Sequence, residues 1–245
     1  MLAIIGGSGL TKLANLEVGR RKLSRTPYGD PSGALTYGRI GDKDVLFLAR
    51  HGYGHTIAPH EVNYRANLWA LKQAGADSVV SVASVGGIRN DVWPGMILLP
   101  HQIIDYTWGR ISTFFEGPGA PVNHIDFTEP YARGLRARLL KAAGAAGERV
   151  TDGGVYAATQ GPRLETAAEI NRLERDGADI VGMTGMPEAA LAREIGLEYA
   201  AIAVVANYAA GRGDSQRAVP LDRIEAVLDE AMGRVRRIIE RFCEQ

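Results

Sequence analysis

The chain has 245 residues, of which 28 are Lys or Arg and 28 are Asp or Glu, so its formal net charge at pH 7 is zero. Without a net charge there is no long-range field to gather nucleic acid or an anionic membrane, and small-molecule ligands are favoured. The single cysteine, Cys243, excludes an intramolecular disulfide, and the sequence shows neither a membrane span nor a signal peptide, so we expect a cytoplasmic protein.

Apolar runs that end in glycine or polar residues predict buried strands, and apolar residues at helical spacing predict helices. In chain order we expect a strand at Leu2–Ile5, a strand at Val45–Ala49, a helix at 60–75, a strand at Ser78–Ser84, an apolar run at Met96–Ile104, a long loop at 110–128, a helix at 131–145, a strand at Val155–Thr159, a helix at Thr166–Arg175, a strand at Ile180–Met183, a helix at Glu188–Ile195, a strand at Tyr199–Ala206 and a helix at 221–243.

This order of elements predicts an α/β fold. Because the strands are continuously apolar, we expect a largely buried, mixed sheet flanked by helices. A chain of this length can bury a substantial core in one large domain. There is no internal repeat, low-complexity tract or linker, so residues 1–245 are predicted to form a single domain.

In open α/β sheets, ligands bind beyond the carboxyl ends of the strands. The polar residues at these positions are Ser8 in a Gly-Gly-Ser-Gly loop, Arg50, His51, Ser84 and Thr184. A guanidinium, several hydroxyls and loop amides suit a bound phosphate. The glycine loop lacks the Lys of a P-loop, and Arg50 and Thr184 could be solvated strand ends. Their coincidence at one edge of the sheet favours the phosphate site.

Two other kinds of site are disfavoured. His51, His55 and His60 are close in sequence, but no HExxH pattern or acidic cluster accompanies them, so ordinary hydrogen bonds are favoured over a metal site. No Ser or Cys lies in a nucleophile elbow, which argues against a covalent hydrolase. We therefore expect no metal.

Five segments carry a family resemblance. They are IIGGSGL (4–10), LARHGYGHTIAPHEVNYRANLWALK (48–72), SVASVGGIR (81–89), QGPRLETAAE (160–169) and GMTGMPEAALARE (182–194). With these, the chain resembles the purine nucleoside phosphorylase and methylthioadenosine phosphorylase family over nearly its whole length, in particular the methylthioadenosine branch. The resemblance implies a nucleoside phosphorylase fold with a partly barrel-like sheet, a homotrimer, and phosphorolysis of a purine nucleoside, with inorganic phosphate as co-substrate and no cofactor.

The resemblance also implies roles for individual residues. Phosphate is expected to bind to Ser8, Arg50, His51, Ala83, Ser84 and Thr184. Met183 matches the residue whose backbone meets the ribose hydroxyls. Leu164 stands where the family usually has a phenylalanine over the purine, so base stacking is expected to be weaker or differently arranged.

Two residues depart from the methylthioadenosine branch at the base. That branch usually carries two aspartates where this sequence has Asn207 and Ala209. An asparagine amide can donate to O6 while its carbonyl accepts from a protonated N7. Glu165 matches a glutamate of the 6-oxopurine phosphorylases that accepts from N1–H. Alternatively, Asn207 caps a strand end and Glu165 is an acid favoured by a helix dipole. We expect Asn207, Ser84 and Arg50 to carry the catalytic step on a 6-oxopurine.

The pocket for the 5' group is expected at Leu221, flanked by Val219 and Ile224, where 6-oxopurine phosphorylases have a histidine. Burying a hydroxyl there without a partner costs about 1–3 kcal/mol, so a methylthio group is favoured. His124 resembles a residue that reaches this pocket from a neighbouring subunit. The predicted substrate is 5'-methylthioinosine. The alternatives are a methylthioadenosine phosphorylase, a nucleoside hydrolase and a non-catalytic nucleoside-binding module.

Overall fold

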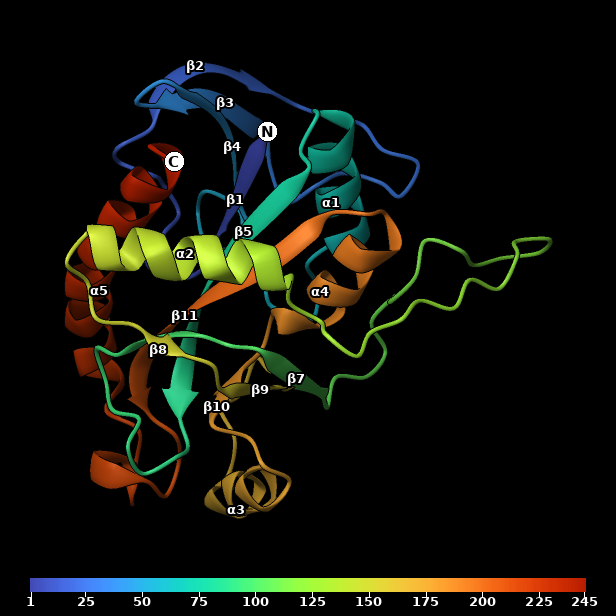
Figure 1. The fold of residues 1–245 in the computed structure, drawn as a ribbon. Helices are drawn as coiled ribbons and strands as arrows, with labels where there is room; N and C mark the ends of the chain where they lie inside the picture. The colour runs from blue at the N-terminus through green and yellow to red at the C-terminus, as the bar shows by residue number, and fades with distance from the viewer.

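The computed structural model describes all residues, 1–245, as one α/β unit in which eleven strands form a single mixed sheet (Figure 1). The strands are β1 (Leu2–Gly6), β2 (Glu17–Lys22), β3 (Leu35–Ile40), β4 (Lys43–Ala49), β5 (Ser78–Gly87), β6 (Ile97–Leu99), β7 (Gln102–Asp105), β8 (Thr151–Asp152), β9 (Val155–Ala158), β10 (Ile180–Gly182) and β11 (Glu198–Tyr208). The helices are α1 (Tyr64–Gln73), α2 (Arg133–Ala145), α3 (Ala167–Arg175), α4 (Gly185–Glu194) and α5 (Leu221–Cys243), with a 3-10 turn η1 (Gly213–Ser215).

The sheet branches at β5. Along one side, the first half of β5 pairs in parallel with β1, and its last two residues pair antiparallel with β10. Along the other side, β5 pairs in parallel with β11 over its whole length. The carboxyl ends of β1, β4, β5 and β11 therefore lie at the same edge. The expected mixed sheet flanked by helices is confirmed.

Alternate residues of the central strands pack into two cores on opposite faces of the sheet. In β4, Leu46 and Leu48 belong to one core, and Val45 and Phe47 belong to the other. This alternation is the two-residue period of a strand with both faces covered. Helices α1 and α4 cover the first face, and α2 and α5 cover the second (Figure 1).

The helix ends follow local sequence signals. Asn63 caps α1 by accepting from the Ala66 N–H, which starts the helix after the predicted residue 60. Thr166 and Glu169 form a reciprocal capping box at α3. In α5, buried apolar residues recur at helical spacing from Leu228 to Cys243, which fixes this part of the helix against the sheet. No helix in the structure has the length and apolar character needed to cross a membrane.

Several boundaries differ from the sequence prediction. Strand β2 was missed because all six of its residues are exposed, so it has no apolar alternation; β3, β8 and η1 were also not predicted. The apolar run Met96–Ile104 divides into β6 and β7, with Pro100 between them, because proline has no N–H for a ladder. The predicted long loop at 110–128 contains no helix or strand and projects from the body of the molecule (Figure 1).

Candidate active site

Most of the predicted site residues line one cavity of about 460 Å³. The predicted residues in its wall are Ser8, Arg50, His51, Ala83, Ser84, Leu164, Glu165, Met183, Thr184, Asn207, Ala209, Val219 and Ile224. They come from segments far apart in the sequence, and the sheet brings them together at the edge where β1, β4, β5 and β11 end. A cavity of this size can enclose a nucleoside-sized ligand.

Arg50 is fully buried and is held by a network of hydrogen bonds. Its Nε and Nη2 donate to the two carboxylate oxygens of Glu188 at 2.7 and 3.0 Å, and its Nη1 donates to the Val82 carbonyl at 3.1 Å. Ser81 Oγ accepts from Nη2, while Ser81 and Tyr199 each donate a hydroxyl to Glu188. One Nη1–H has no protein partner, so the guanidinium can still donate to an anion in the cavity.

Burial alone would lower the pKa of Arg50, but the charge and hydrogen bonds of Glu188 outweigh it and raise the pKa above its ordinary value. Arg50 is therefore a permanent cation. Glu188, which sequence analysis did not single out, is its counter-ion. The only sequence signal for Glu188 is an acidic residue inside an otherwise apolar helix segment, since residues 185–189 of α4 are all buried.

His51 is a neutral imidazole at neutral pH. Burial, followed by the nearby positive charge of Arg50, lowers its pKa to about 4. Its Nδ1 lies 2.8 Å from the Ile57 carbonyl, and a carbonyl only accepts, so Nδ1 carries the proton. Nε2 is then left as an acceptor. The His51 side chain therefore adds no positive charge to the cavity.

The glycine loop is shaped by close backbone contacts. A Cβ on Gly7 would lie 2.5 Å from the Val82 carbonyl and 2.8 Å from Arg50 Nη1, so no larger residue fits between β1 and β5. Ser8 follows at the rim, with its Oγ 3.4 Å from His55 Nε2. On the opposite side, Thr184 is the N-cap of α4 but makes no side-chain capping bond, so its hydroxyl is free of that role.

The far end of the cavity carries the residues predicted for the base. Strand β11 has a bulge between Val205 and Asn207, and Ala206 and Asn207 both line the cavity. The Asn207 amide nitrogen donates one hydrogen to the Tyr208 carbonyl at 2.7 Å, which leaves its second N–H and its carbonyl oxygen available. Glu165 Oε1 accepts from Thr159 Oγ1 at 2.6 Å.

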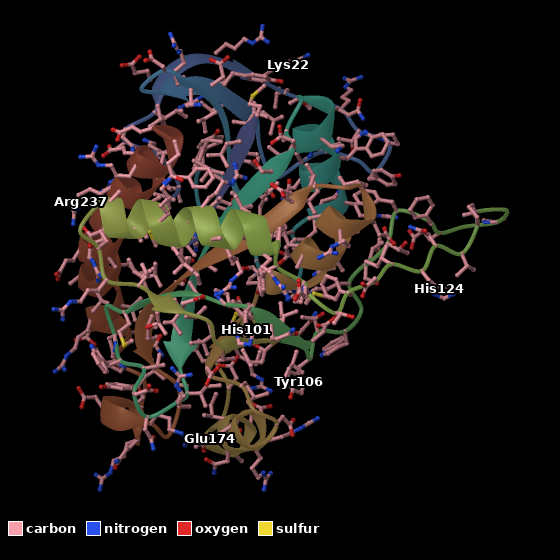
Figure 2. The ribbon with its side chains drawn as sticks, viewed as in Figure 1. Lys22, His101, Tyr106, His124, Glu174 and Arg237 are labelled. Atoms are coloured by element: carbon pink, nitrogen blue, oxygen red, sulfur yellow. The ribbon has the colours of Figure 1, made fainter.

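Two predicted residues lie outside this cavity. Leu221 is exposed and lines a smaller adjoining cavity of about 360 Å³, because it is the first residue of α5 and points away from the larger space. Ile224, one helical turn later, faces the larger cavity instead. His124 lies on the projecting loop, far from the site of its own chain (Figure 2).

The histidines do not gather into a metal-binding group. The rings of His51 and His55 are 5.0 Å apart, but no cluster of three or more His, Cys, Asp or Glu side chains is placed to hold a metal ion. Besides these two imidazoles, the functional groups that line this cavity are a guanidinium, hydroxyls, an amide and a carboxylate.

Comparison with known proteins matches residues 1–244 to the family model of the phosphorylase superfamily. The chain belongs to this superfamily. It is 54% identical over 239 residues, covering 98% of this chain and 96% of the relative, to a probable S-methyl-5'-thioinosine phosphorylase of Pseudomonas syringae. It is 46% identical over 215 residues, covering 86% of this chain and 80% of the relative, to a 6-oxopurine nucleoside phosphorylase of Pyrococcus furiosus.

Among solved structures, the chain is similar to a methylthioadenosine phosphorylase from Schistosoma mansoni in complex with adenine. The TM-score is 0.94 at 32% identity, over 99% of this chain and 90% of that chain. This match confirms the expected nucleoside phosphorylase fold.

Proposed function

We propose that the chain catalyses the phosphorolysis of S-methyl-5'-thioinosine to hypoxanthine and 5-methylthioribose 1-phosphate. The observation that carries the proposal is that Asn207 and Glu165 line the same cavity as Arg50 and Thr184. One wall thus offers groups for an anion, and the other offers an amide and a carboxylate for a purine edge. Relatives named as S-methyl-5'-thioinosine phosphorylases support this substrate.

At the phosphate end, the free Nη1–H of Arg50 and the hydroxyls of Ser8, Ser84 and Thr184 are proposed to bind inorganic phosphate. A phosphate oxygen attacks C1' as the bond from C1' to N9 of the purine breaks, and the electron pair of that bond passes to the base. Positive charge develops on the ribose, and the bound anion stabilises it. Met183 is proposed to meet the ribose hydroxyls.

At the base end, the leaving purine takes up a proton at N7, which balances the proton that monohydrogen phosphate releases through solvent as it forms the sugar phosphate. The Asn207 carbonyl oxygen accepts a hydrogen bond from the protonated N7. The remaining Asn207 N–H donates to O6. Glu165 accepts from N1–H, a donor that hypoxanthine has and adenine lacks. Leu164 and Ala209 complete the apolar walls around the base.

The 5' end is proposed to hold a methylthio group. Val219 and Ile224 line the cavity with apolar side chains, which would leave a buried hydroxyl without a partner. Leu221 has no place in this revised assignment of the 5' pocket, since it faces the adjoining cavity.

We further propose that the enzyme works as a homotrimer in the cytoplasm, without metal or organic cofactor. The projecting loop carries exposed apolar residues at Trp108, Ile111, Phe115 and Val122. Exposed apolar groups on one projecting segment favour burial against another subunit. His124, which lies on this loop (Figure 2), would then contribute to a neighbour's 5' pocket.

A substrate panel tests the proposed function. Methylthioinosine, methylthioadenosine and inosine are each assayed with and without phosphate. We expect cleavage to require phosphate, with methylthioinosine used roughly 10² to 10⁴ times more efficiently than methylthioadenosine, since two buried hydrogen-bond mismatches oppose adenine.

The other outcomes each select an alternative. A ratio near one, or one favouring methylthioadenosine, indicates a methylthioadenosine phosphorylase. Cleavage without phosphate indicates a hydrolase. Binding without turnover indicates a non-catalytic nucleoside-binding module.

A further inference from the structure

Thr159 occupies a fixed position at the end of β9. Its backbone N–H donates to the Gly182 carbonyl at the end of β10, at 2.8 Å. Its own carbonyl accepts from Arg110 Nη2 at 3.3 Å, and the same nitrogen donates to the Gln160 carbonyl at 2.8 Å. The strand ends and the guanidinium therefore hold the Thr159 backbone in place.

The Thr159 hydroxyl is directed at Glu165. Oγ1 lies 2.6 Å from Glu165 Oε1 and 3.3 Å from the Gly182 carbonyl oxygen. The hydroxyl has one hydrogen, and the shorter contact, to the Glu165 carboxyl oxygen, is the stronger of the two. No other side chain or backbone group of the chain hydrogen-bonds the Glu165 carboxylate, so Oε2 is left without a protein partner.

Glu165 has two places to direct its carboxylate. It lines both the larger cavity and the adjoining cavity of about 360 Å³. It also lies just before Thr166, the N-cap of α3. The bond from Thr159 is the one hydrogen bond within the chain that orients this carboxylate, while Arg163 adds only a nearby charge.

We propose that Thr159 is a specificity-determining residue that acts by orienting Glu165. This inference rests on the proposed preference for a 6-oxopurine. With Oε1 occupied by the hydroxyl, Oε2 is an acceptor held toward the base. It accepts from N1–H of hypoxanthine, and it opposes the N1 lone pair of adenine. Without the hydroxyl, the carboxylate turns into the adjoining cavity. The favourable hydrogen bond with hypoxanthine and the repulsion of adenine are then both weakened.

The test compares efficiencies for methylthioinosine and methylthioadenosine in three proteins: wild type, Thr159→Val and Thr159→Ser. Valine keeps the shape of threonine and removes the hydroxyl. We expect its discrimination ratio to fall roughly ten-fold, the effect of losing a hydrogen bond to a charged group. Serine keeps the hydroxyl and should retain most of the ratio. Thr159→Ala replaces the valine variant if that protein does not fold.

A double-mutant cycle separates orientation of Glu165 from a general structural effect. In a Glu165→Ala background, Thr159→Val should not change the ratio further, because the group it orients is absent. An equal fall in both backgrounds would overturn the inference.

The wild-type ratio distinguishes failure of the inference from failure of the proposed function. A wild-type ratio near one overturns the 6-oxopurine assignment itself. A high wild-type ratio that persists in Thr159→Val overturns only the role of Thr159.

Discussion

The two ends of the active-site cavity are built in different ways. At the phosphate end, four of the five N–H groups of Arg50 already have protein partners, and the side chain is buried in the wall of the cavity. At the base end, the side chains of Asn207 and Glu165 each make one hydrogen bond within the chain. The cation is therefore held by a buried network of several groups, whereas the base selection that we propose depends on single side chains that a few substitutions can change.

The largest effect is expected from a substitution at the phosphate end of the cavity. Arg50→Met should lower kcat/KM for phosphate about 10²- to 10³-fold, because a preorganised cation is lost. It should also destabilise the fold by about 3–5 kcal/mol, since Glu188 becomes a buried charge without a counter-ion. Phosphate-saturation kinetics and chemical unfolding measure the two effects.

The double variant Arg50→Met with Glu188→Gln is the matched control. It should recover much of the stability, because no buried charge is left unpaired, but not the use of phosphate. A folded single variant with an unchanged KM for phosphate would remove Arg50 from the site.

A smaller effect is expected when two residues at the base end of the cavity are replaced. Asn207→Asp combined with Ala209→Asp should move the efficiency ratio toward methylthioadenosine by about 10²-fold. Glu165 remains in place, so the exchange should be incomplete. The measurement is the ratio of the two efficiencies, with the KM for phosphate recorded alongside. If that KM changes as much as the ratio does, the two ends of the cavity are not independent.

A third effect concerns the pH dependence of stability at the phosphate end, where activity is not the quantity measured. The pKa of His51 is about 4 in the folded chain and 6.5 in the absence of the fold. Between these values the unfolded chain binds a proton that the folded chain does not, so the free energy of unfolding falls as pH decreases from 6.5 to 4. The contribution is about 2–3 kcal/mol.

Urea unfolding at pH 7 and pH 4.5 measures this dependence. His51→Gln should lose less stability on acidification than wild type. His60→Gln, at an exposed position, serves as the control and should behave like wild type. Equal losses in all three proteins would contradict the buried, neutral state of His51.

Sequence patterns predicted the elements that are buried on both sides. β1, β5 and β11 were visible as apolar runs because covered strands have no polar face. β2 was not visible, because it is exposed along its whole length and owes its place to pairing with β3. The hydrophobic pattern reports burial, and it does not reveal an exposed strand such as β2, which is held by pairing with β3 and by Arg20 and Arg21 over the rings of Tyr37 and Tyr53.

The candidate site follows the same rule. Residues that follow apolar strands could be proposed from the sequence, and they share one cavity. The partners Glu188 and Thr159 could not, because each acts through a contact that only the fold creates; Arg50 and Glu188 are 138 positions apart. Leu221 lines the adjoining cavity and Ile224 the larger one, a difference that the sequence does not show because it does not reveal which face of the first turn of α5 meets each cavity.

The bulge in β11 changes which face of the sheet the following residues point to. From Tyr199 to Ala206 the residues alternate between two cores and leave no position free for a polar group. The bulge between Val205 and Asn207 shifts the pairing with β5 by one residue, and Asn207, together with Ala209 just beyond the strand, lines the cavity. The residues of β11 before the bulge thus pack into the cores, and those after the bulge face the cavity in a different register. We expect that residues on one side of the bulge can be substituted without changing the register of those on the other side, as long as the bulge itself is kept.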